Sequence, residues 1–309
     1  MPDQPPARPL HSADYFGDQR DFWWNADYLA LVARRLAFER VRDVLDLGCG
    51  IGHWGRALLP HLPPSARITG IDAEPEWVKK STAIAATRGV ASRVNYLHGR
   101  AEQIPFPETS FDLVTCQTLL IHVRDPVAVL REMLRVLRPG GLLLAVEPSN
   151  IASALGISSF NAAWPINDRL RIARFQAICE RGKAALGEGD NSVGDLVPGM
   201  MQEAGATDIR VWQNERAFPL LPPYESPDQQ ADAKQVLEFA ERDFWGWNKP
   251  DTHRYFIAGG GEESEFETLW RFGVTANRAE AAEITARRYH RAGGTIIYLI
   301  AGRKPPAAA

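Results

Sequence analysis

Short apolar runs alternate with amphipathic segments through the first half of the chain. The runs are too short for helices and apolar enough for buried parallel strands, and they occupy residues 44–47, 68–71, 94–97, 111–116 and 142–146. Helices are expected between them, at 53–61, 76–88 and 127–137. This alternation predicts an open α/β sheet, in which ligands bind beyond the carboxyl ends of the strands.

Beyond residue 150 the pattern becomes mainly helical. Helices are expected at 168–186, 229–243, 263–272 and 276–292, with strands near 209–212 and 295–302. The last strand is rich in β-branched residues, and we expect it to lie antiparallel beside the fifth strand. The predicted organisation is an N-terminal aromatic helical segment (1–40), a core (41–213) that includes a helical segment (151–192), a mainly helical insertion (214–293) and a final core strand (294–304).

The most informative stretch is the loop that follows the first apolar run. Asp46 ends the strand, and Gly48, Gly50 and Gly52 follow in a D-x-G-x-G-x-G pattern. Glycines permit left-handed backbone angles and close approach of a ligand. The dinucleotide fingerprint G-x-G-x-x-G would need glycine where this chain has His53, and an acid beside the loop would repel a pyrophosphate. The alternatives are a loop that attracts a cationic ligand and a chance glycine-rich turn.

With these residues the chain resembles the class I S-adenosylmethionine-dependent methyltransferases, and specifically their small-molecule, ubiquinone- and menaquinone-biosynthesis branch. The resemblance implies a Rossmann-like α/β fold, whose seven-stranded, mostly parallel sheet has an antiparallel last strand. It also implies that the loop wraps the methionine part of S-adenosylmethionine. The cofactor residues expected there are Asp46, Gly48, Cys49, Gly50 and Gly52.

A second match to this family lies at the end of the second strand. Asp72 lies 20 residues beyond Gly52, and a carboxylate there can accept hydrogen bonds from both ribose hydroxyls. Ala73 is expected near the adenine, and Trp77 either lies there too or packs on the next helix. Where similar enzymes carry an Asp-Ala pair after the third strand, this chain has Arg100-Ala101-Glu102. Arginine cannot accept a hydrogen bond, so Ala101 is expected to contact the adenine, with Glu102 or a stacked Arg100 as compensation.

The ends of the fourth and fifth strands supply the remaining core candidates. Gln117 is expected to face the methyl-donor end of the pocket. His122 is interpreted as a cofactor contact, as a base or as a loop anchor. Glu147 ends the fifth strand and is a candidate for lining the acceptor pocket.

Aromatic residues outside the core are candidates for the acceptor side. Tyr15, Phe16 and Trp24 either pack the N-terminal helix or form a lid, since aromatic faces would suit a sulfonium. In the insertion, Trp245, Trp247 and Tyr255 either line an acceptor pocket, pack internally or form a dimer contact.

Composition narrows the partners. The chain has 309 residues and a net charge of −3 without a strong basic run, so a nucleic acid is not the expected partner. Cys49, Cys116 and Cys179 are too few and too far apart for a disulfide framework or a zinc cluster. No metal motif, signal sequence or membrane span is recognisable, so a cytoplasmic protein without metal is expected. The oligomeric state stays open, with a homodimer as one alternative.

The resemblance implies transfer of a methyl group by direct displacement. The acceptor would be an oxygen, nitrogen or carbon nucleophile of a small molecule, and S-adenosylhomocysteine would be the product. Two alternatives remain open at this point: non-methyl chemistry that uses the cofactor's positive charge, and a catalytically silent protein that only binds the cofactor.

Overall fold

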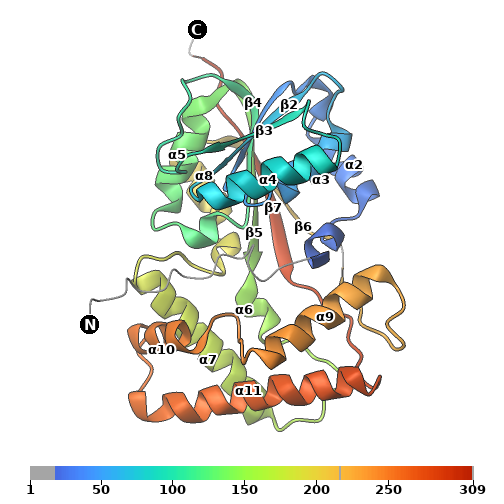
Figure 1. Ribbon diagram of the computed structural model, residues 1–309. Coiled ribbons are helices and arrows are strands. Elements are labelled where there is room, and N and C mark those ends of the chain that lie inside the picture. Colours follow the sequence, from blue (N-terminus) through green and yellow to red (C-terminus); the bar gives the residue numbers. More distant parts are fainter. Residues whose placement is uncertain (1–17, 216, 308–309) are drawn as a thin grey trace, which may run out of the picture. The chain divides into compact units, whose positions relative to one another are not determined.

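A computed structural model of the chain describes residues 18–215 and 217–307, which form two compact units (Figure 1). The described residues of the sheet unit are 24–153, 187–215 and 295–307, and those of the helical unit are 18–23, 154–186 and 217–294. The chain therefore passes between the units several times, and neither unit is one continuous segment.

The sheet unit is built on seven strands in the order β3-β2-β1-β4-β5-β7-β6. The strands are β1 (Asp43–Leu47), β2 (Arg67–Asp72), β3 (Val94–His98), β4 (Phe111–Gln117), β5 (Leu137–Ser149), β6 (Thr207–Gln213) and β7 (Ile296–Arg303). Strands β1 to β5 run parallel to one another, whereas β7 runs antiparallel to both β5 and β6. The predicted Rossmann-like fold with an antiparallel last strand is confirmed.

Helices flank this sheet (Figure 1). The helices of the sheet unit are α2 (Ala26–Arg35), α3 (His53–Leu58), α4 (Pro75–Thr87), α5 (Pro126–Val136), α6 (Asn150–Ser153), which follows the end of β5, and α8 (Val197–Ala204). The 3-10 segments are η2 (Phe38–Arg40), η3 (Leu59–His61), η4 (Leu120–His122) and η5 (Val193–Asp195). On one face, Met133 of α5 and Met201 of α8 pack with Val114 of β4. On the other face, the Trp54 indole N–H of α3 donates to Thr115 Oγ1 at 2.8 Å. Because successive strand residues point to opposite faces, both layers are anchored on β4.

Local signals in the sequence explain where these helices begin and end. The Asp125 carboxylate accepts the Ala128 N–H at 2.9 Å, and Pro126 occupies the first turn of α5, as expected for a helix N-terminus. Helix α8 ends at Gly205, whose φ of +103° is the left-handed C-terminal conformation that glycine favours.

The helical unit contains η1 (Asp18–Phe22), α7 (Ile166–Ala185), α9 (Pro227–Glu241), α10 (Lys249–Ala258) and α11 (Glu263–Thr285). Its aromatic core includes Phe175, Phe256 and Phe266, whose ring centroids lie 5.2 to 6.1 Å apart. Helices α7 and α10 approach so closely at Gly182 that a Cβ there would lie 1.7 Å from the Tyr255 carbonyl oxygen.

The prediction of two helices at 263–272 and 276–292 is wrong, because one helix, α11, spans Glu263–Thr285. Gly273 lies in its interior, where glycine is normally unfavourable. A Cβ there would lie 2.8 Å from the Trp245 ring, so the glycine makes room for an aromatic neighbour and does not end the helix.

The division into units also differs from the predicted domains at two places. Residues 154–186 group with the insertion and not with the core, since Phe175 and Cys179 of α7 share a hydrophobic cluster with α10 and α11. Residues 24–40 group with the sheet unit, where the Tyr28 hydroxyl of α2 donates to the Gln213 carbonyl of β6 at 2.7 Å.

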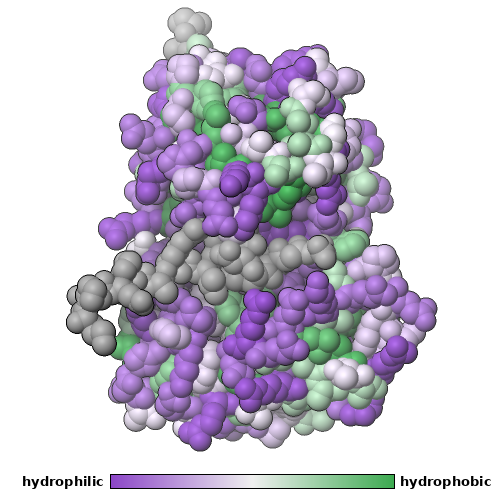
Figure 2. Space-filling model, in the orientation of Figure 1, coloured by the Kyte–Doolittle hydropathy of each residue, from purple (hydrophilic) through white to green (hydrophobic). Residues whose placement is uncertain are grey.

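Hydrophilic residues occupy much of the visible face, with smaller hydrophobic patches between them (Figure 2). Among the described residues, no helix combines the length and the apolar character needed to cross a bilayer.

Candidate functional site

The carboxyl ends of β2, β1 and β4 form the candidate site. Strand order reverses on either side of β1, because β2 pairs with one of its edges and β4 with the other. In open α/β sheets, ligands bind in the crevice beyond the strand ends at such a switch point. The glycine loop, Asp72 and Gln117 all follow or end these three strands.

The glycine loop depends on its glycines in two ways. Gly48, Gly50 and Gly52 have φ values of +67°, +50° and +74°, which side chains disfavour. In addition, a Cβ at Gly48 would lie 2.6 Å from Leu119 Cδ1, and one at Gly52 would lie 2.1 Å from the Tyr96 hydroxyl. Side chains of the same chain therefore pack directly under the loop.

Asp46 lies beneath this loop and is almost completely buried. Its Oδ2 accepts the Gly55 N–H of α3 at 3.0 Å. Burial raises the pKa of the Asp46 carboxyl to about 7, although the Gly55 N–H and the Arg56 guanidinium oppose the shift. In this structure Asp46 holds α3 to the end of β1, and its expected attraction for a cationic ligand stays a prediction.

Asp72 connects two of the loops. Its Oδ2 accepts the Gly50 N–H at 2.8 Å, and its Oδ1 accepts the Glu74 N–H at 3.0 Å. The side chain is only 4% exposed. Each carboxylate oxygen can accept more than one hydrogen bond, so the carboxylate can hold the loops and still accept from a ligand hydroxyl.

The predicted adenine residues lie on and after β2 and β3. Ala101 is nearly buried, while Ala73, Arg100 and Glu102 are exposed. The Arg100 guanidinium pairs with the Glu102 carboxylate at 3.3 Å. An exposed pair of this kind contributes little to stability, so both side chains can rearrange around a ligand at low cost.

Gln117 ends β4 and is 8% exposed. Within the described part of the chain, neither its amide oxygen nor its amide nitrogen has a hydrogen-bond partner. Buried polar groups are nearly always paired, so this amide is a candidate for a polar contact with a ligand at the switch point. Cys49 of the glycine loop is also buried, and burial raises the pKa of its thiol.

His122 and Glu147 both belong to the region after β4. His122 is partly buried in η4, and its backbone N–H donates to the Leu119 carbonyl at 2.9 Å. Glu147 is fully buried, and its Oε1 accepts the N–H groups of Leu119 and Leu120, each at 2.9 Å. Glu147 therefore contacts the backbone of the segment that carries His122.

The contacts of the aromatic residues predicted to line an acceptor pocket do not distinguish that role from internal packing. Trp24 packs on Trp54 with ring centroids 5.4 Å apart, and Tyr15 and Phe16 lie outside the described residues. Trp245 and Trp247 pack against the aromatic cluster of the helical unit, which contains Tyr255. Their expected role at an acceptor pocket stays a prediction.

Two residues that sequence reasoning missed support the glycine loop from below. Tyr96 of β3 is in register with Gly70 of β2, and a Cβ at Gly70 would lie 2.5 Å from the Tyr96 ring. Arg56 of α3 donates to the Ile51 carbonyl in the loop. A glycine inside an apolar strand indicates close approach of another group. Gly70 was therefore the sequence signal from which the Tyr96 contact could have been predicted.

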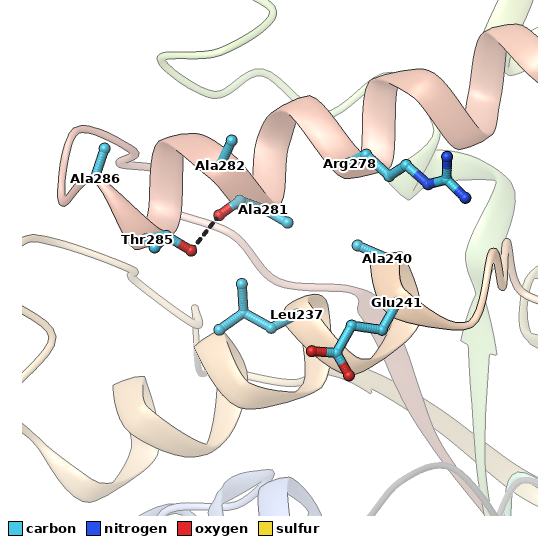
Figure 3. A pocket seen from close by; sticks show the side chains of 8 residues that line it. All are labelled: Leu237, Ala240, Glu241, Arg278, Ala281, Ala282, Thr285 and Ala286. Carbon is cyan, nitrogen blue, oxygen red and sulfur yellow. Dashed lines mark hydrogen bonds between the residues drawn. The ribbon is translucent and has the colours of Figure 1, made fainter.

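An open groove of about 690 Å³ lies between α9 and α11 of the helical unit (Figure 3). It is lined by Leu237, Ala240, Glu241, Arg278, Ala281, Ala282, Thr285 and Ala286. The Thr285 hydroxyl donates to the Ala281 carbonyl of its own helix at 2.9 Å. The groove contains none of the predicted site residues. Among the residues described, no cluster of His, Cys, Asp and Glu side chains suits a metal ion.

Comparison with known proteins agrees with this arrangement. Residues 44–141 match a family model described as a methyltransferase domain. The chain is 35% identical over 131 residues to the demethylmenaquinone methyltransferase of Geobacillus kaustophilus (strain HTA426), which covers 42% of this chain and 54% of that protein. It is 33% identical over 136 residues to the uncharacterized methyltransferase YcgJ of Bacillus subtilis (strain 168). This alignment covers 44% of this chain and 52% of that protein.

The chain thus spans about half the length of the curated relatives it matches. The crystal structure of YcgJ from Bacillus subtilis has the same fold, with a TM-score of 0.50 and 19% identity over 92% of this chain and 100% of that one. The matched segment runs from β1 into β5 and contains the glycine loop, Asp72 and Gln117. Residues 44–141, which contain the candidate site, therefore resemble a methyltransferase domain.

Proposed function

We propose that this protein transfers a methyl group from S-adenosylmethionine to a small-molecule acceptor. The observation that carries the proposal is the set of polar groups around the switch point, where a positive-φ glycine loop, the buried Asp72 carboxylate and the unpartnered Gln117 amide end or follow adjacent strands. The methyltransferase names of the relatives favour methyl transfer over the alternative chemistries.

The residues present fit this cofactor. The glycine loop, with Gly48, Cys49, Gly50 and Gly52, would hold the methionine part, and Asp72 would accept the ribose hydroxyls. Ala73, Arg100, Ala101 and Glu102 would border the adenine. Bound S-adenosylmethionine supplies a methyl group made electrophilic by its sulfonium sulfur. The unpaired Gln117 amide supports the fit because it offers both a donor and an acceptor.

The protein's own contribution is alignment and exclusion of water. The Asp72 carboxylate fixes the loops after β1 and β2 relative to each other through Gly50 and Glu74. Holding two reactants in line lowers the entropic part of the barrier. His122 is the proposed base for acceptors that keep a proton, since imidazole is neutral enough near pH 7 to take one.

The acceptor is proposed to be a small molecule with an oxygen, nitrogen or carbon nucleophile, and a cytoplasmic location is proposed with it. The three cysteines are free and buried, which suits a reducing compartment. The helical unit is proposed to act as the substrate cap, with Trp245, Trp247 and Tyr255 as its candidate contacts.

Calorimetry with S-adenosylmethionine, followed by product analysis with a panel of phenols, amines and carboxylates, tests the proposal. We expect saturable binding and formation of S-adenosylhomocysteine with at least one acceptor class. Absence of binding to the folded protein would reject the proposal. Binding with turnover that yields no S-adenosylhomocysteine would instead favour non-methyl chemistry.

A further inference from the structure

Glu147 is a buried acid whose role the cofactor does not explain. It ends the apolar part of β5, and its side chain is completely inaccessible. Its Oε1 accepts the N–H groups of Leu119 and Leu120 at 2.9 Å each and lies 3.7 Å from the Cys116 thiol. Burying a carboxylate is costly unless hydrogen bonds compensate. The acid is therefore committed to the segment after β4.

That segment borders the glycine loop. The Leu119 side chain occupies the space that a Cβ of Gly48 would need, only 2.6 Å from its ideal position. Thr118, the residue before Leu119, has a φ of +52°, which a β-branched residue rarely adopts. Such a conformation persists only when its surroundings enforce it. Glu147 supplies two of the hydrogen bonds that do so, and the Thr118 N–H supplies a third by donating to the Val146 carbonyl at 2.9 Å.

The second oxygen of Glu147 differs from the first. Among the described residues, Oε2 has no hydrogen-bond partner. The elements that contact β5 carry four titratable groups in this region: Cys116 of β4, Tyr298 opposite Glu147 in β7, Asp195 of η5, which accepts from Tyr298, and His122 of η4. In the described part of the chain, no cation contributes to the electrostatics of Glu147, so its charge depends on the N–H groups of Leu119 and Leu120.

We propose that Glu147 is a positioning residue for the methyl-transfer site, one that holds the segment after β4 against the glycine loop when its carboxylate is ionised. The proposal rests on the function proposed above. A carboxylate accepts hydrogen bonds more strongly than a neutral acid. Protonation therefore loosens the segment that presents Leu119 to Gly48 and carries His122.

The proton equilibrium of Glu147 falls in an accessible range. Burial raises the pKa of this carboxyl to about 7, although the N–H groups of Leu120 and Leu119 oppose the shift. The ionised form, and with it the tight arrangement of the segment, thus predominates above pH 7 and is lost below it. Cofactor affinity is expected to fall as the pH drops through this range.

Three variants of the full chain separate positioning from general stability. Glu147→Gln keeps an acceptor oxygen but removes the charge, and Glu147→Leu removes the acceptor. Asp112→Asn is the matched control. Asp112 also accepts two backbone N–H groups, those of Arg42 and Asp43 at 2.8 and 3.0 Å, but it lies at the end of β4 away from the segment that Glu147 contacts. Calorimetry measures S-adenosylhomocysteine binding at pH 6 and pH 8, and thermal unfolding verifies the fold.

We expect the wild-type affinity to be several-fold lower at pH 6 than at pH 8, and this difference to vanish in Glu147→Gln. Glu147→Leu should bind at least about tenfold more weakly at pH 8, because two buried N–H groups lose their acceptor. Asp112→Asn should bind like the wild type. Wild-type affinity in folded Glu147→Leu, or equal weakening in Asp112→Asn, would overturn the proposal. So would a pH step that persists in Glu147→Gln, because it would belong to another group.

A measurement without ligand keeps this test independent of the proposed function. Hydrogen exchange of peptides covering residues 118–122 should be faster in Glu147→Leu than in the wild type, and unchanged in Asp112→Asn. If the wild type binds no S-adenosylhomocysteine but shows this difference, the function fails and Glu147 still holds the segment. Equal exchange in all three proteins would refute the role of Glu147 itself.

Discussion

The two carboxylates next to the glycine loop, Asp46 and Asp72, differ in the hydrogen bonds that they accept, and this difference indicates different roles. Asp72 accepts N–H groups from both flanking loops, whereas Asp46 accepts one from α3. Both are buried, so each acceptor oxygen influences the loop strongly.

Replacement of Asp72 by alanine should weaken S-adenosylmethionine binding by more than about tenfold, because charged acceptors make the stronger hydrogen bonds. Calorimetry measures the affinity, and circular dichroism shows whether the variant is folded. Asp72→Asn, which keeps one acceptor oxygen, is the control and should lose less. A folded Asp72→Ala protein with unchanged affinity would disprove the ribose assignment.

Asp46 predicts a pH dependence of stability. Because its pKa in the folded protein is raised from 3.8 to about 7, the folded state binds this proton more tightly than the unfolded state. The contribution to stability is therefore complete below pH 3.8 and is lost as the pH rises through about 7. One pKa unit corresponds to about 1.4 kcal/mol, so the effect amounts to a few kcal/mol.

Asp46→Asn should make this decline smaller, while its amide oxygen still accepts the Gly55 N–H. The raised pKa of Glu147 contributes the remaining decline over the same pH range. Urea unfolding between pH 4 and pH 8 measures the free energy of unfolding for both proteins. Asp112→Asn is again a suitable control, because hydrogen bonds lower the pKa of Asp112 and its effect falls at more acidic pH. A decline of the same size in wild type and Asp46→Asn would contradict the role of Asp46.

At the scale of elements, the strands of the core could be predicted well from the sequence. Fully buried runs such as 44–47 and 142–146 leave few alternatives to a parallel strand, and the structure places β1 and β5 over them. The Asp46-to-Gly52 pattern and Asp72 could likewise be read locally, because each directly follows or ends a buried strand, and their role in binding stays a prediction.

Elements and contacts that depend on distant partners could not be predicted. Gly273 fits inside α11 only because Trp245 lies against it. The hydrogen bonds of Glu147 join β5 to η4, nearly 30 residues apart in sequence. Neither relation leaves a periodic pattern along the chain, which is why the helix break at 273–275 was wrongly predicted and the partners of Glu147 were missed.

The crossing of α7 and α10 gives a prediction for an element. Gly182→Ala would place a Cβ 1.7 Å from the Tyr255 carbonyl oxygen, so the helices must separate. Overpacking of this kind typically costs about 1–3 kcal/mol. Chemical unfolding should show a loss in that range or larger. Gly199→Ala in α8, where a Cβ meets nothing within 4 Å, should be neutral or stabilising, and equal losses in both variants would contradict the argument.

At the scale of the whole molecule, ligand binding should act first on the sheet unit. Ligand at 100 times its dissociation constant stabilises the state that binds it by about 2.7 kcal/mol. With S-adenosylhomocysteine we expect slower hydrogen exchange in peptides covering 46–55, 72–74 and 117–122. Peptides from α9 serve as the internal reference. Protection confined to the helical unit would contradict the placement of the site.

Strand β7 lies inside the sheet, between β5 and β6, although it follows β6 by about 80 residues along the chain. During translation, β6 therefore leaves the ribosome well before the strand that connects it to the rest of the sheet. Until then the edge of β5 is open, and an exposed edge strand can pair with other chains. A nascent polypeptide of this kind needs protection from aggregation for the time taken to synthesise the helices in between.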